Sequence, residues 1–225
     1  MRRAGRRLQL GKALGEDGTA NEWIRLLTGP GQAKEERIIA KWFSDLASNP
    51  DSIPVEWGRG LVALIPKKGD PETPADFRPI ALLSHFGKFF ELCLLEWLNE
   101  KHDADQKLHR SQFGFRNGIG TQECSMLLAA HSEICRSYKK SLILVFLDIK
   151  KAYDSIDKRV LARCLLDLGL PASFVKWNLR YMEVQERQLM LRTEGQQTLQ
   201  WFHLLCGVPQ GSPISPFLFL SLIHI

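Results

Sequence analysis

The sequence predicts an α+β fold, because segments with the period of an amphipathic helix are separated by short apolar runs that favour β-strands. One helix face is marked by apolar residues at helical spacing: Ile38, Ile39, Trp42, Phe43 and Leu46. Two runs have the length and composition of strands, GLVALIP at 60–66 and LILVFL at 142–147. With 225 residues, 44% of them apolar, the chain is long enough for one large domain or two small ones.

The N-terminal end, residues 1–15, is expected to be flexible and carries a basic cluster of Arg2, Arg3, Arg6 and Arg7. Such a cluster is typical of a solvated tail, and a nucleic-acid-binding arm or a nuclear signal is the alternative. Residues 19–22 have the pattern of a capping box, which predicts a short helix at this point.

In the middle of the chain, predicted helices alternate with a strand, a loop and a turn. The helix through 38–46 should end at Asn49, because the residue before a proline is disfavoured in a helix. The strand at 60–66 leads into a basic loop at 67–75 that glycine and proline interrupt. Helices are then predicted at 86–99 and 121–139, on either side of a glycine-punctuated turn at 112–120.

The run at 142–147 has no polar residue, so it predicts a strand that is buried on both faces and stops at Asp148. Asp157 is placed to cap a helix that Gly169 closes. Segments 188–193 and 197–205 predict a hairpin around Gly195. Residues 206–216 are too rich in glycine and proline for a regular element, and a final helix or strand begins at Phe217.

Charge and cysteine content indicate what kind of partner and which cellular environment to expect. The net charge of +5 and the isoelectric point near 9.0 indicate a polyanionic partner without excluding an ordinary basic enzyme. Five cysteines lack zinc-like spacing and are predicted to be reduced, buried thiols: Cys93, Cys124, Cys135, Cys164 and Cys206. Neither end carries a signal peptide or a run long enough to span a bilayer, so we expect a soluble intracellular protein with no membrane partner.

Asp148 is the sharpest chemical feature, because the end of a buried strand is where open α/β sites are usually built. An ionised carboxylate beside such an apolar strand needs a partner. A divalent cation is one candidate, and Lys150 or Lys151 is another. Taken alone, such an aspartate is more often a simple cap or ion-pair partner than a metal ligand.

Five segments, in order, resemble the motifs of reverse transcriptases. Residues 146–157 (FLDIKKAYDSID) resemble motif A, most of all that of non-LTR, LINE-type retrotransposons. Residues 15–25 (GEDGTANEWIR) resemble the stretch ahead of the fingers. Residues 64–91 (LIPKKGDPETPADFRPIALLSHFGKFFE) and 112–120 (QFGFRNGIG) resemble two fingers motifs, and 207–219 (GVPQGSPISPFLF) resembles motif B. The resemblance covers nearly the whole chain.

The resemblance implies a fold and an activity. The fold would be that of a right-hand polymerase, with a flexible basic terminus at 1–15, helical fingers at 16–140 and a partial palm at 141–225. The palm would be a split βαβ antiparallel sheet, and the thumb would be absent. The activity would be RNA-directed DNA polymerisation, with an RNA template, a DNA primer, dNTPs and two Mg²⁺ ions in the complete enzyme. A nuclear location follows for a LINE-type element.

The resemblance also assigns roles to residues. The Asp148 side chain and the Ile149 carbonyl would hold metal. The incoming triphosphate would be gripped by Lys67, Lys68 and Arg78, for which a solvated loop is the ordinary alternative. Further nucleotide contacts fall on two short segments: Lys150, Lys151, Ala152 and Tyr153, and Pro209, Gln210 and Gly211. Tyr153 would stack beneath the deoxyribose, or else be a core aromatic. Arg116 would contact the template or serve the structure.

The sequence also departs from the family pattern. It contains no adjacent pair of aspartates, whereas the family places such a pair after motif B. We therefore expect a fragment that is truncated after motif B and has no polymerase activity by itself. A gene-model artefact and a decayed element would each explain the truncation. The alternatives in function are a nucleic-acid-binding module without catalysis and a decayed element remnant.

Overall fold

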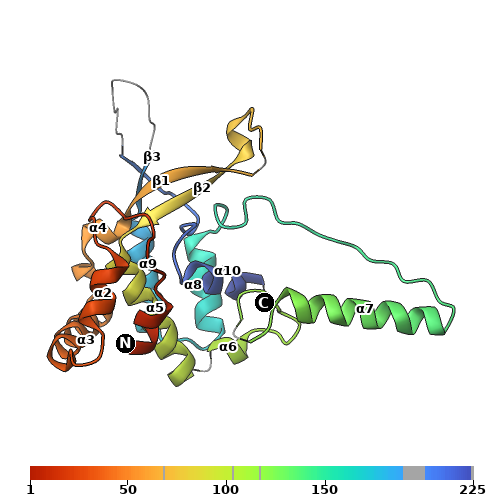
Figure 1. The fold of residues 1–225 in the computed structure, drawn as a ribbon, viewed down its shortest axis with the longest axis horizontal. Helices are drawn as coiled ribbons and strands as arrows, with labels where there is room; N and C mark the ends of the chain where they lie inside the picture. The colour runs from red at the N-terminus through yellow and green to blue at the C-terminus, as the bar shows by residue number, and fades with distance from the viewer. Residues whose placement is uncertain (68, 103, 117, 190–200, 224–225) are drawn as a thin grey trace.

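A computed structural model describes residues 1–67, 69–102, 104–116, 118–189 and 201–223. These residues form a mixed α/β structure, with a small sheet standing on a helical body and one helix projecting from it (Figure 1). The predicted α+β class is confirmed at this level.

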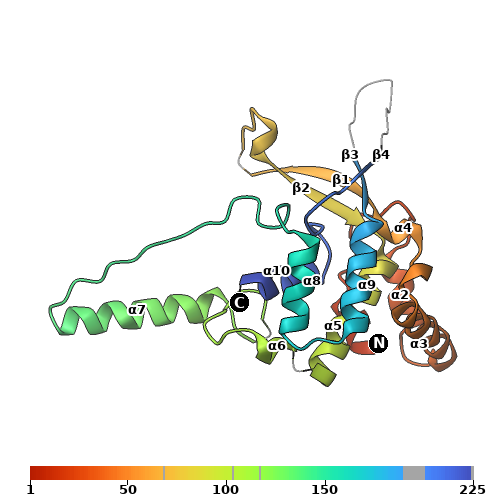
Figure 2. The same ribbon diagram turned by 180° about the vertical axis from the view of Figure 1, so that it is seen from behind.

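Helices make up most of the body, and α8 and α9 lie side by side within it (Figure 2). The helices before the projecting segment are α1 (Arg2–Arg7), α2 (Asn21–Leu27), α3 (Ala33–Ser48), α4 (Val55–Gly58), α5 (His85–His102) and α6 (Ala104–Lys107). They are followed by α7 (Thr121–Ser137), α8 (Lys158–Asp167), α9 (Ala172–Glu183) and α10 (Ser215–Ile223). Two short 3₁₀ helices are η1 (Pro50–Ser52) and η2 (Pro74–Asp76).

The sheet has four strands in the order β2-β1-β3-β4. They are β1 (Arg59–Pro66), β2 (Phe77–Leu83), β3 (Glu186–Leu189) and β4 (Trp201–His203). β1 pairs antiparallel with β2 and parallel with β3, and β3 pairs antiparallel with β4. The strand predicted at 60–66 is confirmed, and so is the antiparallel pairing of the predicted hairpin. Its expected turn at Gly195 lies outside the described residues.

The core lies beneath the sheet, where α3, α5 and α9 meet. It is rich in buried aromatic side chains, among them Phe43, Trp57, Phe89, Phe90 and Trp177. The Phe43 and Phe90 rings meet edge to face with centroids 4.9 Å apart, a favourable arrangement for two aromatic rings. This packing fixes α5, which carries one anchor of the functional site described below.

The N-terminal residues differ from the predicted flexible end. Residues 2–7 form α1, Ala4 is fully buried, and Leu8 is buried as well. Two of the predicted basic residues, Arg3 and Arg7, pair with Glu96 of α5. The apolar side chains of Ala4 and Leu8 dock α1 against the body. Because arginines surround these residues, the sequence did not indicate this docking.

Helix caps give a mixed outcome. The side chain of Asp157 accepts hydrogen bonds from the backbone N–H groups of Arg159 and Val160, so the predicted cap of α8 is confirmed. The capping box predicted at 19–22 is wrong. The helix begins at Asn21 without a side-chain cap, and Glu22 accepts a hydrogen bond from the backbone of Gly11.

The strand predicted at 142–147 is wrong. Residues 141–149 have no regular secondary structure, and their side chains are exposed, with Leu147 91% accessible. A strand needs a neighbour to accept its backbone hydrogen bonds. The sheet has the order β2-β1-β3-β4, and the segment pairs with none of these strands and lies apart from them (Figure 1).

The four-stranded sheet contains residues from both sides of residue 140. β1 and β2 come from the range assigned to fingers, β3 and β4 come from the range assigned to palm, and β1 pairs with β3. The core likewise joins residues from both ranges. Sheet and core thus draw on both ranges, and the division into fingers and palm stays a prediction.

The cysteines are free thiols, but the prediction that all are buried is wrong. Cys164 is buried, Cys93 and Cys135 are half-buried, and Cys124 and Cys206 are exposed. Among the described residues, every helix is too short or too polar to cross a lipid bilayer.

Candidate functional site

Three segments that are far apart in the sequence line one pocket of about 610 Å³. The β1–β2 hairpin contributes Lys67, residues 74–75 and residues 77–79. The turn before α8 contributes residues 151–154, and the turn before α10 contributes Gln210. The fold therefore brings together parts of three motifs that sequence analysis singled out separately.

The β1–β2 hairpin shapes one wall. Ile65 pairs with Arg78 in the antiparallel ladder, and the backbone N–H of Lys67 donates to the Asp76 carbonyl at 2.8 Å. The Lys67 ammonium donates to the carbonyl of Ala75 at 2.7 Å, which holds the lysine against η2. Arg78 is exposed at the start of β2. Both cations therefore lie on a strand-supported wall.

The turn at 151–154 forms the facing wall. The backbone N–H groups of Asp154 and Ser155 both donate to the carbonyl of Lys151, at 2.9 and 3.0 Å. Lys151 itself has a positive φ of 50°. This tight turn presents Lys151, Ala152 and Tyr153 to the pocket although the preceding segment is not part of the sheet.

Hydrogen bonds attach that turn to the segment before α10. The N–H of Val208 donates to the Tyr153 carbonyl at 2.9 Å, and the N–H of Gly207 donates to the Ile156 carbonyl at 2.8 Å. A Cβ atom at Gly207 would lie 2.8 Å from the Tyr153 carbonyl oxygen, and φ is +86° there. Glycine is thus required for the two segments to approach this closely.

The turn at Gln210 is attached in the same way to β2. The N–H of Ala81 donates to the Gln210 carbonyl at 2.8 Å. At Gly211, φ is +122°, and a Cβ atom would meet the Ala81 carbonyl oxygen at 2.5 Å. Pro209 is buried, and its carbonyl accepts the N–H of Ser212 at 3.3 Å. Gln210 is therefore held at the pocket by backbone geometry.

Glu91 anchors the far side of this turn from within α5. One of its carboxylate oxygens accepts the Ser212 hydroxyl at 2.6 Å and the Ile214 N–H at 3.3 Å. Burial raises the pKa of Glu91, while the hydrogen bonds from Ser212 and Ile214 oppose that rise. Lys88, one turn earlier, has a pKa lowered by burial and lies near enough for charge attraction to Glu91.

Tyr153 is packed as well as exposed to the pocket. Its ring stacks on Phe219 of α10, with centroids 5.5 Å apart and planes 23° from parallel. The side chain is half-buried, and this burial raises the pKa of its phenol. The predicted core role and the predicted pocket role are both compatible with this position.

The pocket is positively charged. Among the described residues that line it, Lys67, Arg78 and Lys151 are cations and Asp154 is the one carboxylate. Cations in a confined pocket attract polyanions, and arginine in particular can form two parallel hydrogen bonds to a phosphate. The arrangement suits a ligand that carries several phosphate charges.

Asp148 and its neighbours lie outside the pocket lining. Asp148, Ile149 and Lys150 are exposed residues at the end of the irregular segment. The described residues hold no group of three or more His, Cys, Asp or Glu side chains that could bind a metal. This donor set does not fit two divalent ions. The expected location of Asp148 at a sheet edge is wrong because that strand is not formed.

Of the two further predicted residues, only Arg116 can be placed, and it lies apart from the pocket. Lys68 lies outside the described residues. Arg116 lines a separate pocket of about 360 Å³ together with Arg7 and Phe217. Its guanidinium donates to the backbone carbonyl of His109 at 3.2 Å, which gives it a local structural contact.

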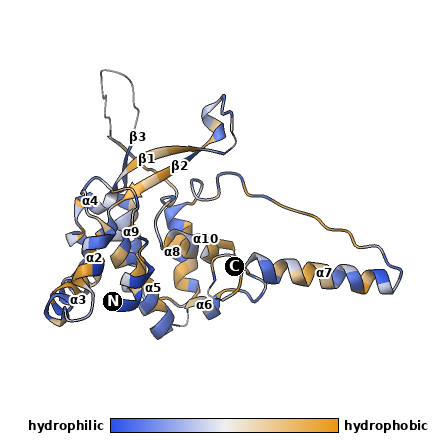
Figure 3. Cartoon of the chain, viewed as in Figure 1, coloured by the Kyte–Doolittle hydropathy of each residue, from blue (hydrophilic) through white to orange (hydrophobic). Residues whose placement is uncertain are grey.

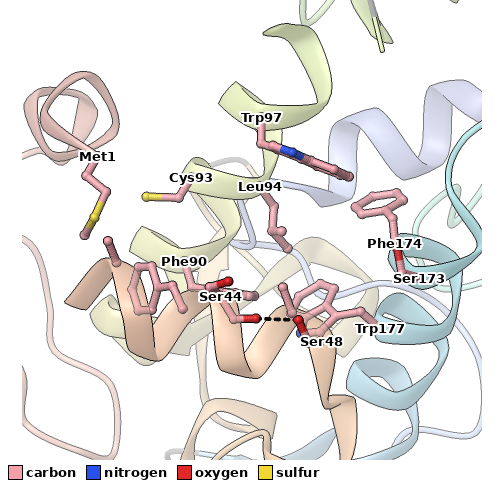
Figure 4. A pocket seen from close by; sticks show the side chains of 13 residues that line it. Met1, Ser44, Ser48, Phe90, Cys93, Leu94, Trp97, Ser173, Phe174 and Trp177 are labelled. Atoms are coloured by element: carbon pink, nitrogen blue, oxygen red, sulfur yellow. Dashed lines mark hydrogen bonds between the residues drawn. The ribbon is translucent and has the colours of Figure 1, made fainter. Parts of the chain in front are cut away.

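An apolar pocket of about 450 Å³ lies between α3, α5 and α9 (Figure 4). Phe90, Trp97 and Trp177 line it, and its described lining includes no charged side chain. Burial raises the pKa of Cys93 in this pocket to about 12, so its thiol stays protonated and weakly nucleophilic. The described residues that line this pocket therefore include no cation to neutralise phosphate and none of the predicted site residues.

Sequence analysis assigned no role to Glu91, Gly207, Ser212 or Phe219, although each supports the pocket. Glu91 carried a usable signal, because it is the one charged residue within the run FFELCLL at 89–95. A charge inside a buried helix face needs a specific partner. The contacts of Gly207 and Phe219 depend on tertiary packing, so no pattern in the sequence indicates them.

The family comparison agrees with the motif analysis. A profile of the family described as "Reverse transcriptase (RNA-dependent DNA polymerase)" matches residues 65–225, well over half of the chain. The matched range includes all three segments that line the charged pocket. The chain belongs to the reverse transcriptase family.

Its relatives are proteins of non-LTR retrotransposons. The chain is 30% identical over 174 residues to the Retrovirus-related Pol polyprotein from type-1 retrotransposable element R2 of Popillia japonica, covering 76% of this chain and 23% of that protein. It is 29% identical over 214 residues to the RNA-directed DNA polymerase from mobile element jockey of Drosophila melanogaster, covering 95% and 22%. It is 31% identical over 167 residues to the Probable RNA-directed DNA polymerase from transposon BS of the same species, covering 74% and 18%. The chain thus spans about a fifth of the length of these relatives.

Proposed function

We propose that this chain is part of an RNA-directed DNA polymerase and that its charged pocket binds the incoming dNTP. In the whole protein, the reaction would be nucleotidyl transfer from the dNTP to a primer 3′-hydroxyl on an RNA template. The observation that carries the proposal is the joining of three distant motif segments around one cationic pocket. Membership in the reverse transcriptase family supports the same substrate class.

In this proposal, different pocket residues contact different parts of the nucleotide. Lys67, Arg78 and Lys151 would offset the charge of the triphosphate, where charge-assisted hydrogen bonds are strongest. Tyr153, fixed by its stacking on Phe219, would pack against the sugar. Gln210 would complete the pocket from a turn that β2 and Glu91 hold in place. In this proposal the β1–β2 hairpin belongs to the fingers, and the segments around Tyr153 and Gln210 belong to the palm.

Reverse transcriptases generally use divalent metal ions. We propose Mg²⁺ as the ion for the whole protein, with Asp148 and the Ile149 carbonyl among its ligands, because hard oxygen donors suit it. In the described residues Asp148 is exposed and outside the pocket lining, so the arrangement does not fit a two-ion site. The described residues support nucleotide binding.

Nucleotide binding by the 225-residue chain tests the proposal. We expect a fluorescent dATP analogue to bind, and Arg78→Ala to weaken binding about tenfold or more, as loss of a charge-assisted hydrogen bond does. Arg110→Ala is the matched control, because Arg110 is an exposed arginine outside the pocket lining. Equal affinity of the two variants would contradict the proposal.

Primer extension tests the expected lack of activity. With an RNA template, dNTPs and Mg²⁺, the 225-residue chain should incorporate no nucleotide above an Asp148→Asn control. One aspartate and one backbone carbonyl cannot offset the repulsion between two divalent cations. Incorporation by the unmodified chain alone would show that the expectation is wrong.

A nucleic-acid-binding module without catalysis is the second candidate function. The position of Asp148 outside the pocket and the net charge of +5 favour it. Such a module would bind RNA through backbone charge, with an affinity that falls steeply as salt rises. RNA binding that Arg78→Ala leaves unchanged, together with no detectable dATP binding, would favour this candidate.

A further inference from the structure

The outer end of the β1–β2 hairpin is held by polar contacts. The strands of this hairpin are mainly apolar, whereas the end beyond them, which includes η2, is mainly hydrophilic (Figure 3). Residues 72–75 are exposed and Asp76 is half-buried. With few apolar side chains to pack, this end depends on hydrogen bonds for its shape. Pro74 and Ala75 of η2 line the charged pocket, so the shape of this end also shapes the pocket.

The carboxylate of Asp76 collects several donors of this end on one oxygen. Its Oδ2 accepts the Thr73 hydroxyl at 2.7 Å, the Thr73 N–H at 2.8 Å and the Glu72 N–H at 3.3 Å. The backbone N–H of Asp76 donates in turn to the Thr73 carbonyl at 3.0 Å. The hydroxyl and the N–H of Thr73 lower the pKa of Asp76, so these are charge-assisted hydrogen bonds at neutral pH.

The same short segment holds Lys67. The Asp76 carbonyl accepts the Lys67 N–H at 2.8 Å, one residue beyond the last pair of the β1–β2 ladder. The Ala75 carbonyl accepts the Lys67 ammonium at 2.7 Å. Ala75 lies between Thr73 and Asp76, so the hydrogen bonds that join these two residues also fix the direction of its carbonyl. Asp76 itself is not among the described residues that line the pocket.

We propose that Asp76 is a positioning residue of the nucleotide site, because its carboxylate caps η2 and thereby places the Ala75 carbonyl that holds the Lys67 ammonium at the pocket. The proposal rests on the nucleotide-binding function proposed above. An ammonium has three donors, so Lys67 can keep its bond to Ala75 and offer the other two to phosphate oxygens. A carboxylate near a triphosphate would ordinarily repel it. The negative charge of Asp76 is instead offset by the donors of residues 72 and 73.

The affinity for the fluorescent dATP analogue tests this role. Asp76→Ala removes the cap and should weaken binding about three- to tenfold, as the loss of one well-placed hydrogen bond does. Asp76→Asn keeps an acceptor oxygen without the charge and should bind as wild type does. If the carboxylate acted by repelling the triphosphate, both variants would bind more tightly, which would overturn the proposal. Asp70→Ala is the matched control, because Asp70 is an exposed carboxylate of the same loop outside the pocket lining.

A double variant tests whether Asp76 acts through Lys67. Asp76→Ala combined with Lys67→Ala should bind the analogue no more weakly than Lys67→Ala alone, because the lysine that the cap positions is already absent. Two effects that multiply in the double variant would show that Asp76 and Lys67 act independently. That result would overturn the proposal.

Amide hydrogen exchange without nucleotide separates this inference from the proposed function. Asp76→Ala should speed exchange at the N–H groups of Thr73 and Lys67, whereas Asp76→Asn should not, and unchanged exchange in α5 shows that each variant is folded. Unchanged exchange at both positions in Asp76→Ala would overturn the proposal even if the wild type binds dATP. Faster exchange in a chain whose wild type binds no dATP would mean that the cap exists but that the nucleotide function is wrong. The positioning role would then be wrong as well.

Discussion

Replacement of Glu91 gives the most informative test of how the pocket is supported. Glu91→Ala removes the acceptor for both the Ser212 hydroxyl and the Ile214 N–H, and both residues are buried. Each buried donor left without a partner costs about 1–3 kcal/mol. We therefore expect Glu91→Ala to lower the free energy of unfolding by about 2–6 kcal/mol and to weaken nucleotide binding, because the turn that carries Gln210 loses its anchor.

Glu91→Gln is the matched control and adds a pH dependence. Its amide oxygen can accept both hydrogen bonds, so the turn should stay in place. Burial raises the pKa of Glu91 above its ordinary value of 4.5. The stability that the protonated form contributes is present below pH 4.5 and is lost as the pH rises through the raised pKa. Wild type should therefore lose stability relative to Glu91→Gln as the pH rises above 4.5.

The assay is urea denaturation followed by tryptophan fluorescence, with the three proteins compared at pH 4.5 and at higher pH. The reasoning would be refuted if Glu91→Ala unfolded at the same urea concentration as wild type. It would be refuted equally if the difference between wild type and Glu91→Gln stayed constant with pH. Either result would mean that the carboxylate is not buried against the turn.

The remaining predictions concern single positions of the site and its frame. Gly211→Ala should cost about 1–3 kcal/mol of stability and weaken dATP binding, because its φ of +122° and its approach to the Ala81 carbonyl exclude a Cβ atom. An alanine variant that unfolds and binds as wild type does would contradict this. Asp157→Ala should lower the melting temperature at neutral pH, because the N–H groups of Val160 and Arg159 hold the pKa of Asp157 below its usual 3.8. That stabilisation is present above pH 3.8 and is lost as the pH falls through the lowered pKa, so the two melting temperatures should converge in acid.

Local patterns predicted much of the fold. The amphipathic spacing around Phe43 predicted α3, and the apolar run at 60–66 predicted β1. Asp157 predicted the start of α8 because a cap is a contact within one turn. Each of these elements is determined by residues that are close in the sequence. Local sequence patterns were therefore sufficient to predict them.

The strand at 142–147 shows where local patterns are insufficient. Its composition favours a strand, but a strand forms only where a neighbouring strand offers hydrogen bonds. The sequence does not show which strand would lie beside this segment, and in the structure none of β1 to β4 does. The docking of α1 was missed for a related reason, because Ala4 and Leu8 are buried by contacts with residues distant in sequence.

Part of the lining of the candidate pocket coincides with residues that the sequence singled out. The motif resemblance singled out Lys67, Arg78 and Tyr153, which the fold brings to one pocket. Their proximity could not be predicted from composition or period. It depends on hydrogen bonds between segments, such as that from Ala81 to Gln210. Sequence analysis gave Asp148 the greatest weight, but Asp148 lies outside the pocket. Its predicted position depended on a strand at 142–147 that is not formed.

Mapping the position of a bound nucleotide tests the central claim most directly. A photoreactive dATP analogue can be cross-linked to the 225-residue chain, and the labelled peptides can be identified by mass spectrometry. If the charged pocket is the nucleotide site, label should fall on the peptides that contain Arg78 and Tyr153, and excess dATP should suppress it. Label confined to other parts of the chain, or label that excess dATP leaves unchanged, would contradict the account.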